Sequence, residues 1–271
     1  MIQTVATYDS LEGMVAPCPE GLHHLITACA DTKLLLGYHY GEWTFGTPEL
    51  EAAVASCSLS QAELGHVRLL HAILKKHWNE DPEGLVERRG SSQFANLSFL
   101  DAPLADWSDF VAMNAVVDLA ITHVLHSLRG CAFLPVQGST EKMLDEERYH
   151  AHHGRGWFRT LASRDGTRER LCAATARALA SAALWYGPGG EPEDEALVAG
   201  GFKSATNPDL FGALESDIRA MAAATDCRLP PIPAPGFGNW NPATRRPAGT
   251  APDDEILYHL RGTRNAIFKL N

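Results

Sequence analysis

Two long segments with helical periodicity each place a glutamate and a histidine three residues apart inside an otherwise apolar stripe. In the first segment the pair is Glu63 and His66, and leucine and isoleucine side chains continue the same face. In the second segment the pair is Glu147 and His150, with methionine and tryptophan on that face. Residues three apart are neighbours on a helix surface. Because an unpaired buried carboxylate is costly, each pair predicts a cation or another polar partner in the core.

An acidic residue on a separate helical segment precedes each pair. Glu42 precedes Glu63, and Asp118, which is surrounded by apolar residues, precedes Glu147. The order carboxylate, Glu-x-x-His, carboxylate, Glu-x-x-His, with one element per helix, is the ligand order of di-iron and di-manganese carboxylate bundles. The residues predicted to bind two iron ions (Fe2+ or Fe3+), and to form the catalytic site, are Glu42, Glu63, His66, Asp118, Glu147 and His150.

This predicted donor set suits reactions with dioxygen. Its carboxylates offset the charge of two divalent irons, and one imidazole per iron completes a mixed nitrogen and oxygen set that leaves coordination positions open. A bundle core also excludes bulk water from the reacting groups. The sequence therefore predicts O2 as a co-substrate.

Each element of the pattern also has a simpler interpretation. Taken alone, Glu63 and His66 are typical of a surface pair, and Asp118 is typical of a core acid bonded to a neighbour such as His123. The complete series favours the metal site over these alternatives. Glu146, next to the predicted ligand in the second pair, is expected at the surface or behind the ligands.

Long helical patterns dominate the chain, and the alternation typical of strands is nearly absent. We therefore predict an all-α fold built on a four-helix core, with further helices toward the C-terminus. The predicted helices cover residues 21–43, 48–78, 106–129, 139–162, 167–186, 208–225 and 253–268. The segments predicted to lack regular structure are the connector 79–105, the loop 186–194 and a Pro-rich loop at about 228–252.

Composition and charge exclude several classes of protein. The net charge of -10 argues against a nucleic-acid partner, because phosphate binding needs a basic surface. No window approaches the uninterrupted apolar run of a membrane span, and no signal peptide is evident, so a cytoplasmic protein without a membrane partner is expected. The 6 cysteines form no C-x-x-C pair and are expected to be reduced, mostly buried residues.

Several segments resemble the ferritin-like subunits of the phenylacetyl-CoA epoxidase family: DTKLLLGYHYGEWTFGTPELE, AELGHVRLL, SSQFANLSFLDAP and EERYHAHHGRGWFRTLA. The resemblance runs over about residues 25–165 and is closest to the structural, metal-free subunit. The positions at which that subunit has lost its iron ligands hold acidic residues and a histidine here, so the chain resembles the catalytic type in this respect: Glu42, Glu63, His66 and Glu147. Asp118 also fits the catalytic subunits of the family.

The resemblance implies a single ferritin-like di-iron domain over residues 1–271 and a role in a bacterial multicomponent oxygenase. It implies a di-iron monooxygenase that inserts one oxygen atom from O2 into an aromatic acid or its CoA thioester, by epoxidation or hydroxylation. Electrons would come from a separate reductase component. The expected partners are a small-molecule substrate, such as an acyl-CoA, and a second copy or a related subunit in a homodimer or hetero-oligomer.

Other functions remain open from the sequence. One is a biosynthetic di-iron oxygenase that acts on a free or carrier-bound small molecule. Another is a non-catalytic scaffold subunit of an oxygenase complex, which the complete ligand pattern disfavours. If the substrate is an anion, Trp240, Arg245 and Arg246 in the Pro-rich loop are candidate contacts.

Overall fold

The computed structural model describes residues 6–269 and confirms the all-α, ferritin-like fold class. Four long helical elements form the bundle: α1 (Cys18–Glu42), α2 (Leu50–Trp78), the composite helix α4 (Trp107–Ala112), η4 (Met113–Asp118) and α5 (Leu119–Ser127), and α6 (Leu134–Ala162). The additional helices toward the C-terminus are α7 (Asp165–Tyr186), α8 (Pro192–Ala199), α9 (Asn207–Ala223) and α10 (Asp254–Leu260). Short elements are α3 (Pro82–Glu87), η1 (Trp43–Phe45), η2 (Ser91–Gln93), η3 (Ser98–Leu100), η5 (Thr263–Phe268), β1 (Trp240–Asn241) and β2 (Arg246–Pro247).

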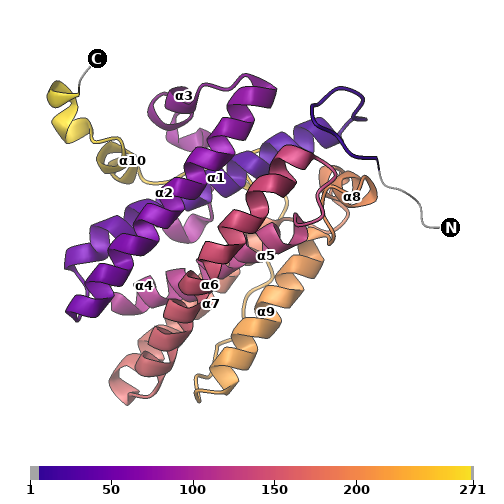
Figure 1. The fold of residues 1–271 in the computed structure, drawn as a ribbon. Coiled ribbons are helices and arrows are strands. Elements are labelled where there is room, and N and C mark those ends of the chain that lie inside the picture. The colour runs from indigo at the N-terminus through magenta and orange to yellow at the C-terminus, as the bar shows by residue number, and fades with distance from the viewer. Residues whose placement is uncertain (1–5, 270–271) are drawn as a thin grey trace.

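Helix α1 packs along α2, and α2 also packs against α6 (Figure 1). Helix α7 covers α6 and the composite helix, and α9 packs beside α5 and α7. A single large cluster of buried apolar side chains runs through these elements. The polar residues buried within it are therefore the exceptions that need an explanation.

The composite helix is the most deeply buried element of the bundle. Over Trp107–Ser127 it is long and apolar enough to cross a membrane by length and composition, but 83% of its most apolar window is buried inside the protein. These apolar residues therefore face the protein core. The middle of the helix, Met113–Asp118, is π-helical, a conformation that is rare and often found at functional sites.

Several predicted boundaries were wrong. Helix α6 begins at Leu134 rather than 139, because Pro135 is accommodated in its first turn. The hydroxyl of Ser139 donates to the carbonyl of Pro135 (3.1 Å) instead of capping the helix. Part of the predicted loop 186–194 forms the start of α8, where the Glu191 carboxylate accepts from the Asp194 amide (2.8 Å).

The expectation that all cysteines are reduced was also wrong. Cys172 in α7 and Cys227, which follows α9, form a disulfide with a Cα–Cα distance of 6.0 Å. The remaining cysteines are free thiols, of which Cys18, Cys29 and Cys131 are buried and Cys57 is exposed. The disulfide links the end of α9 to the helix that covers the bundle. Sequence spacing did not indicate the pair, because its members are 55 residues apart.

The Pro-rich segment 228–252 contains the small β1–β2 hairpin and is anchored on the end of α7. The Trp240 indole donates to the carbonyl of Leu184 (2.9 Å). The Arg245 guanidinium donates to the carbonyl of Trp185 (2.9 Å) and lies 4.4 Å from the centroid of that ring. Arg246 forms an ion pair with Asp101 (2.9 Å). Both arginines are buried and paired within the protein, so the hypothesis that they contact an anionic substrate is not supported.

Candidate metal centre

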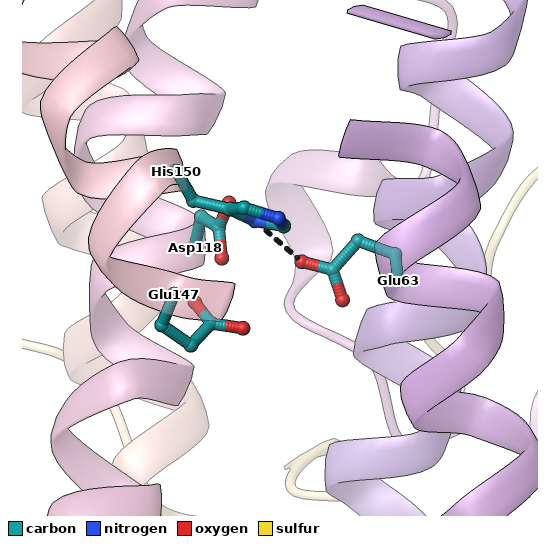
Figure 2. Close-up of side chains that lie close together, drawn as sticks. All are labelled: Glu63, Asp118, Glu147 and His150. Carbon is teal, nitrogen blue, oxygen red and sulfur yellow. Dashed lines mark hydrogen bonds and ion pairs between the residues drawn. The ribbon is translucent and has the colours of Figure 1, made fainter. Parts of the chain in front are cut away.

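Four metal-ligating side chains converge in the core of the bundle. Glu63 comes from α2, Asp118 from the end of η4, and Glu147 and His150 from α6, as Figure 2 shows. Each offers one ligand atom, and these atoms all lie within 4.8 Å of one another. All four residues are buried. The spacing of Glu147 and His150 places both on the core-facing side of α6, as the sequence predicted.

His66 borders this cluster from α2. Its Nδ1 atom lies 3.4 Å from Oε1 of Glu147 and 3.7 Å from Oε2 of Glu63. Its Nε2 atom lies 2.9 Å from Oε2 of Glu146, whose side chain is 40% exposed. Glu146 therefore holds the outer side of the imidazole, which fixes the ring so that Nδ1 faces the carboxylates. Five of the six predicted ligands are thus together in the core.

The sixth position is taken by a lysine that the sequence pattern did not reveal. Lys33 of α1 is 0% exposed, and its Nζ atom donates to Oε2 of Glu63 (2.8 Å) and to Oε1 of Glu147 (2.6 Å). Burial alone would lower the pKa of Lys33, but the two carboxylates raise it above its ordinary value. The ammonium group is therefore a fixed positive charge at the centre of the cluster.

Glu42 lies outside the cluster. Its side chain is 43% exposed, and its carboxylate accepts from the Tyr38 hydroxyl (3.3 Å) and lies 3.8 Å from Nδ1 of His39. Residues nine apart on an α-helix are half a turn out of phase and about 14 Å apart along the axis. Since Lys33 faces the cluster, Glu42 at the end of the same helix must face away from it.

A hydrogen-bond network joins the Asp118 carboxylate on the composite helix to α1 and α6. The Tyr40 hydroxyl donates to Oδ2 of Asp118 (2.8 Å), and Nδ1 of His150 lies 2.9 Å from the same oxygen. The Asn114 amide donates to the Tyr40 hydroxyl (2.8 Å) and to the His150 carbonyl (3.2 Å). One turn further along the composite helix, the Thr122 hydroxyl donates to Oε2 of Glu147 (2.8 Å). The carboxylates are therefore held in place by neutral groups as well as by Lys33.

Proton positions in the cluster follow from these contacts. Burial and the charge of Glu147 raise the pKa of Asp118 to about 7, against the opposing effect of His150. Burial alone would lower the pKa of His150, but Asp118 and Glu63 raise it well above its ordinary value. Burial alone would raise the pKa of Glu63, but Lys33 and His150 lower it well below its ordinary value. These contacts therefore favour the protonated form of His150, whose Nδ1 atom faces Asp118.

Three ligand atoms in the cluster have no hydrogen-bond partner within the described part of the chain: Oε1 of Glu63, Nδ1 of His66 and Oδ1 of Asp118. Buried polar atoms are almost always bonded, so orphaned acceptors gathered at one place indicate an absent ligand. Carboxylate oxygens with imidazole nitrogens are a donor set that suits iron and manganese. These residues fit a metal ion, with Lys33 as the one unexpected member.

Residues 12–240 match the family described as phenylacetic acid catabolic protein. The chain belongs to this family. It is also 27% identical, over 134 residues, to one of the subunits of the 1,2-phenylacetyl-CoA epoxidase of Escherichia coli (strain K12). That alignment covers 49% of this chain and 54% of the relative, so the chain spans about half the length of the curated protein it matches.

Membership of the phenylacetic acid catabolic family confirms the resemblance found in the sequence. The match also includes the whole cluster: Glu63, Asp118, Glu147 and His150 all fall within the matched residues. Lys33 falls within them as well. In this family member, helix α1 therefore contributes a cation to the centre of the bundle.

Proposed function

We propose that this member of the phenylacetic acid catabolic family is an iron-dependent monooxygenase subunit. It would insert one atom of O2 into an aromatic acid or its CoA thioester, by epoxidation or hydroxylation. The observation that carries the proposal is the buried cluster itself, with three unpartnered ligand atoms in a ferritin-like bundle. The family and the similarity to an epoxidase subunit support this class of substrate.

The residues proposed to hold iron are Glu63, His66, Asp118, Glu147 and His150. Iron, when bound, supplies one-electron redox chemistry and open coordination positions for O2. A metal ion binds neutral imidazole, so metal binding competes with the protonated form of His150 that Asp118 stabilises. The affinity for iron is therefore expected to fall at acidic pH.

The surrounding residues position the ligands and exclude water. Tyr40 and Asn114 hold Asp118 and the backbone of α6, and Thr122 holds Glu147. A cavity of about 320 Å³ lies beside Asn114, lined in part by Leu119 and Met221. This volume is in the range of small-molecule sites, and Asn114, whose amide lies 3.4 Å from Oδ2 of Asp118, connects the cavity to the cluster.

The proposed reaction also requires partners. Inserting one oxygen atom reduces the other to water, which consumes two electrons and two protons; a separate reductase component is proposed as the electron source. The similarity to one subunit of an epoxidase supports assembly with a related subunit, or as a homodimer. These partners are part of the proposal.

The test is O2 consumption by protein reconstituted anaerobically with Fe2+, supplied with a flavin/iron–sulfur reductase and with aryl-CoA thioesters or free aromatic acids. We expect a product that carries one 18O atom from 18O2, and none from His150→Ala. Turnover of free acids or carrier-bound substrates alone would favour the biosynthetic alternative. If iron binds but none of these substrates gives a labelled product, this proposal fails.

A non-catalytic role is the second candidate, and Lys33 is the observation that favours it. Its ammonium, together with protonated His150, supplies positive charge to the buried carboxylates without any metal. In that case the purified protein would bind no iron above background. Iron analysis of the anaerobically reconstituted chain therefore separates the two functions before any substrate is known.

A further inference from the structure

Lys33 stands where the bundle pattern calls for a carboxylate. In a two-metal carboxylate bundle, two helices each supply a single glutamate and the other two each supply a Glu-x-x-His pair. Here α2 and α6 supply the pairs, the composite helix supplies Asp118, and α1 supplies Lys33. The ammonium contacts both glutamates of the pairs, from α2 and from α6. It therefore occupies space between the two halves of the ligand set.

Replacing a carboxylate by an ammonium changes the charge of the centre by two units, which equals the charge of one divalent ion. The buried carboxylates are those of Glu63, Asp118 and Glu147. One divalent ion together with the Lys33 ammonium balances their three negative charges. Two divalent ions with the same ammonium leave an excess of two positive charges in the core. Uncompensated charge in a protein interior is strongly unfavourable, so the second ion is disfavoured.

Two of the three cluster atoms without a hydrogen bond are carboxylate oxygens placed in agreement with this count. Oε2 of Glu63 accepts from Lys33, whereas Oε1 of the same residue accepts no hydrogen bond and lies 3.3 Å from Nδ1 of His150, the ion pair dashed in Figure 2. Oδ1 of Asp118 is unpartnered as well. These two oxygens belong to carboxylates that contact His150. The third atom without a hydrogen bond, Nδ1 of His66, lies 3.4 Å from Oε1 of Glu147, the oxygen that accepts from the Lys33 ammonium.

We propose that this centre binds a single metal ion through Glu63, Asp118 and His150, and that the Lys33 ammonium takes the place of a second ion. The inference rests on the proposed metal-dependent function, revises the two irons predicted from the sequence to one, and reduces the five proposed ligands to these three. Lys33 thereby becomes the residue that sets the number of metal ions. Glu147 bonds to the ammonium and lies at the boundary between the two positions.

The number of bound ions is measured by anaerobic titration of the full chain with Fe2+ and, separately, with Mn2+. Metal analysis after desalting gives the stoichiometry, and electron paramagnetic resonance of the Mn2+ form distinguishes an isolated ion from a coupled pair. We expect one ion per chain and the signal of isolated Mn2+. Lys33→Glu restores the missing carboxylate, and it should raise the stoichiometry to two and produce a coupled-pair signal.

Glu42→Gln is the matched control, because it alters a carboxylate of the same helix that lies outside the cluster. It should leave the stoichiometry at one. Two ions per wild-type chain would overturn the inference but leave the proposed function intact, whereas no bound ion would overturn both. One ion in a folded Lys33→Glu variant, checked by circular dichroism, would also overturn it. If that variant does not fold, the wild-type stoichiometry and resonance signal decide the matter.

Discussion

The hydroxyl of Tyr40 lies 2.8 Å from Oδ2 of Asp118 and donates a hydrogen bond to it inside the bundle core. Tyr40→Phe removes this donor without a large change in volume. We expect a loss of about 1–3 kcal/mol in the free energy of unfolding. We also expect roughly 10-fold weaker metal binding, because outer partners orient metal ligands. Urea denaturation and anaerobic calorimetry measure the two effects.

Tyr186→Phe provides the control for this prediction. The buried Tyr186 hydroxyl donates to the carbonyl of Ala120 at the same distance, 2.8 Å, but makes no contact with the cluster. The control should lose comparable stability and retain the metal affinity of the wild type. Equal metal affinity in both variants would show that Tyr40 does not position Asp118.

Adjacent glutamates in α6 should respond very differently to the same substitution. Glu147→Gln removes the charge that contacts the buried Lys33, so we expect about 3 kcal/mol or more of destabilisation and weaker metal binding. Glu146→Gln alters a 40% exposed side chain and retains a hydrogen-bond partner for His66. Its stability should change by less than about 1 kcal/mol. Thermal unfolding with and without metal distinguishes the two, and similar behaviour would contradict the assignment.

Two glycines of α6 form another matched pair. A Cβ atom at Gly154 would lie 2.9 Å from Oδ1 of Asn114 and 3.3 Å from Cα of Ala115, so Gly154→Ala should cost about 1–3 kcal/mol. At Gly156 nothing lies within 4 Å. Gly156→Ala should therefore stabilise the protein by about 0.5–1 kcal/mol, because alanine is the better helix former. Chemical denaturation measures both changes in the free energy of unfolding, and we expect them to have opposite signs.

His39 makes the stability of the protein depend on pH. Burial lowers its pKa from 6.5 to about 4, while Nε2 donates to the carbonyl of Leu100 (3.1 Å). Between these two values the unfolded chain binds a proton that the folded protein does not bind. Stability from this residue is therefore present above pH 6.5 and is lost as the pH falls toward 4, by up to about 3 kcal/mol.

His39→Gln tests this pH dependence, because the amide retains a donor for the Leu100 carbonyl but does not titrate. The fall in stability between pH 6.5 and 4 should become smaller in the variant. It should not vanish, since burial also lowers the pKa of His153 to about 4. Denaturant unfolding over this pH range gives the comparison. Parallel curves for the variant and the wild type would exclude His39 as a source of the effect.

The sequence predicted the Glu-x-x-His pairs because residue spacing on a helix determines which side chains share a face. For α1 the spacing was not decisive, since that helix offers both Lys33 and Glu42, on opposite faces. Only the packing against α2 selects the face that turns inward. Lysine is rarely buried without a partner, so the pattern of α1 does not predict that Lys33 lies in the core. The partners of Lys33 are Glu63 of α2 and Glu147 of α6, so the sequence of α1 alone does not reveal them.

The helices themselves were predicted well where apolar periodicity is long, as in α2 and α7. The sequence did not predict three other features: the π-helical turn, the disulfide and the buried positions of Arg245 and Arg246. These features depend on contacts between residues far apart in the chain. The two arginines, for example, are held by the carbonyl of Trp185 and the carboxylate of Asp101. Local patterns carry no information about such contacts.

The π-helical turn Met113–Asp118 divides the composite helix into two halves with different rotational phases. The first half places Phe110 against the rings of Tyr40 and Trp43, and Asp118, the last residue of the turn, lies in the carboxylate–histidine cluster. Each residue in an α-helix advances by about 100°. Deleting one residue within the turn would convert it to a regular α-helix and rotate the halves against each other by that angle. Only one of the two could then keep its contacts, so this turn sets the rotation between the aromatic contacts of Phe110 and the candidate metal site.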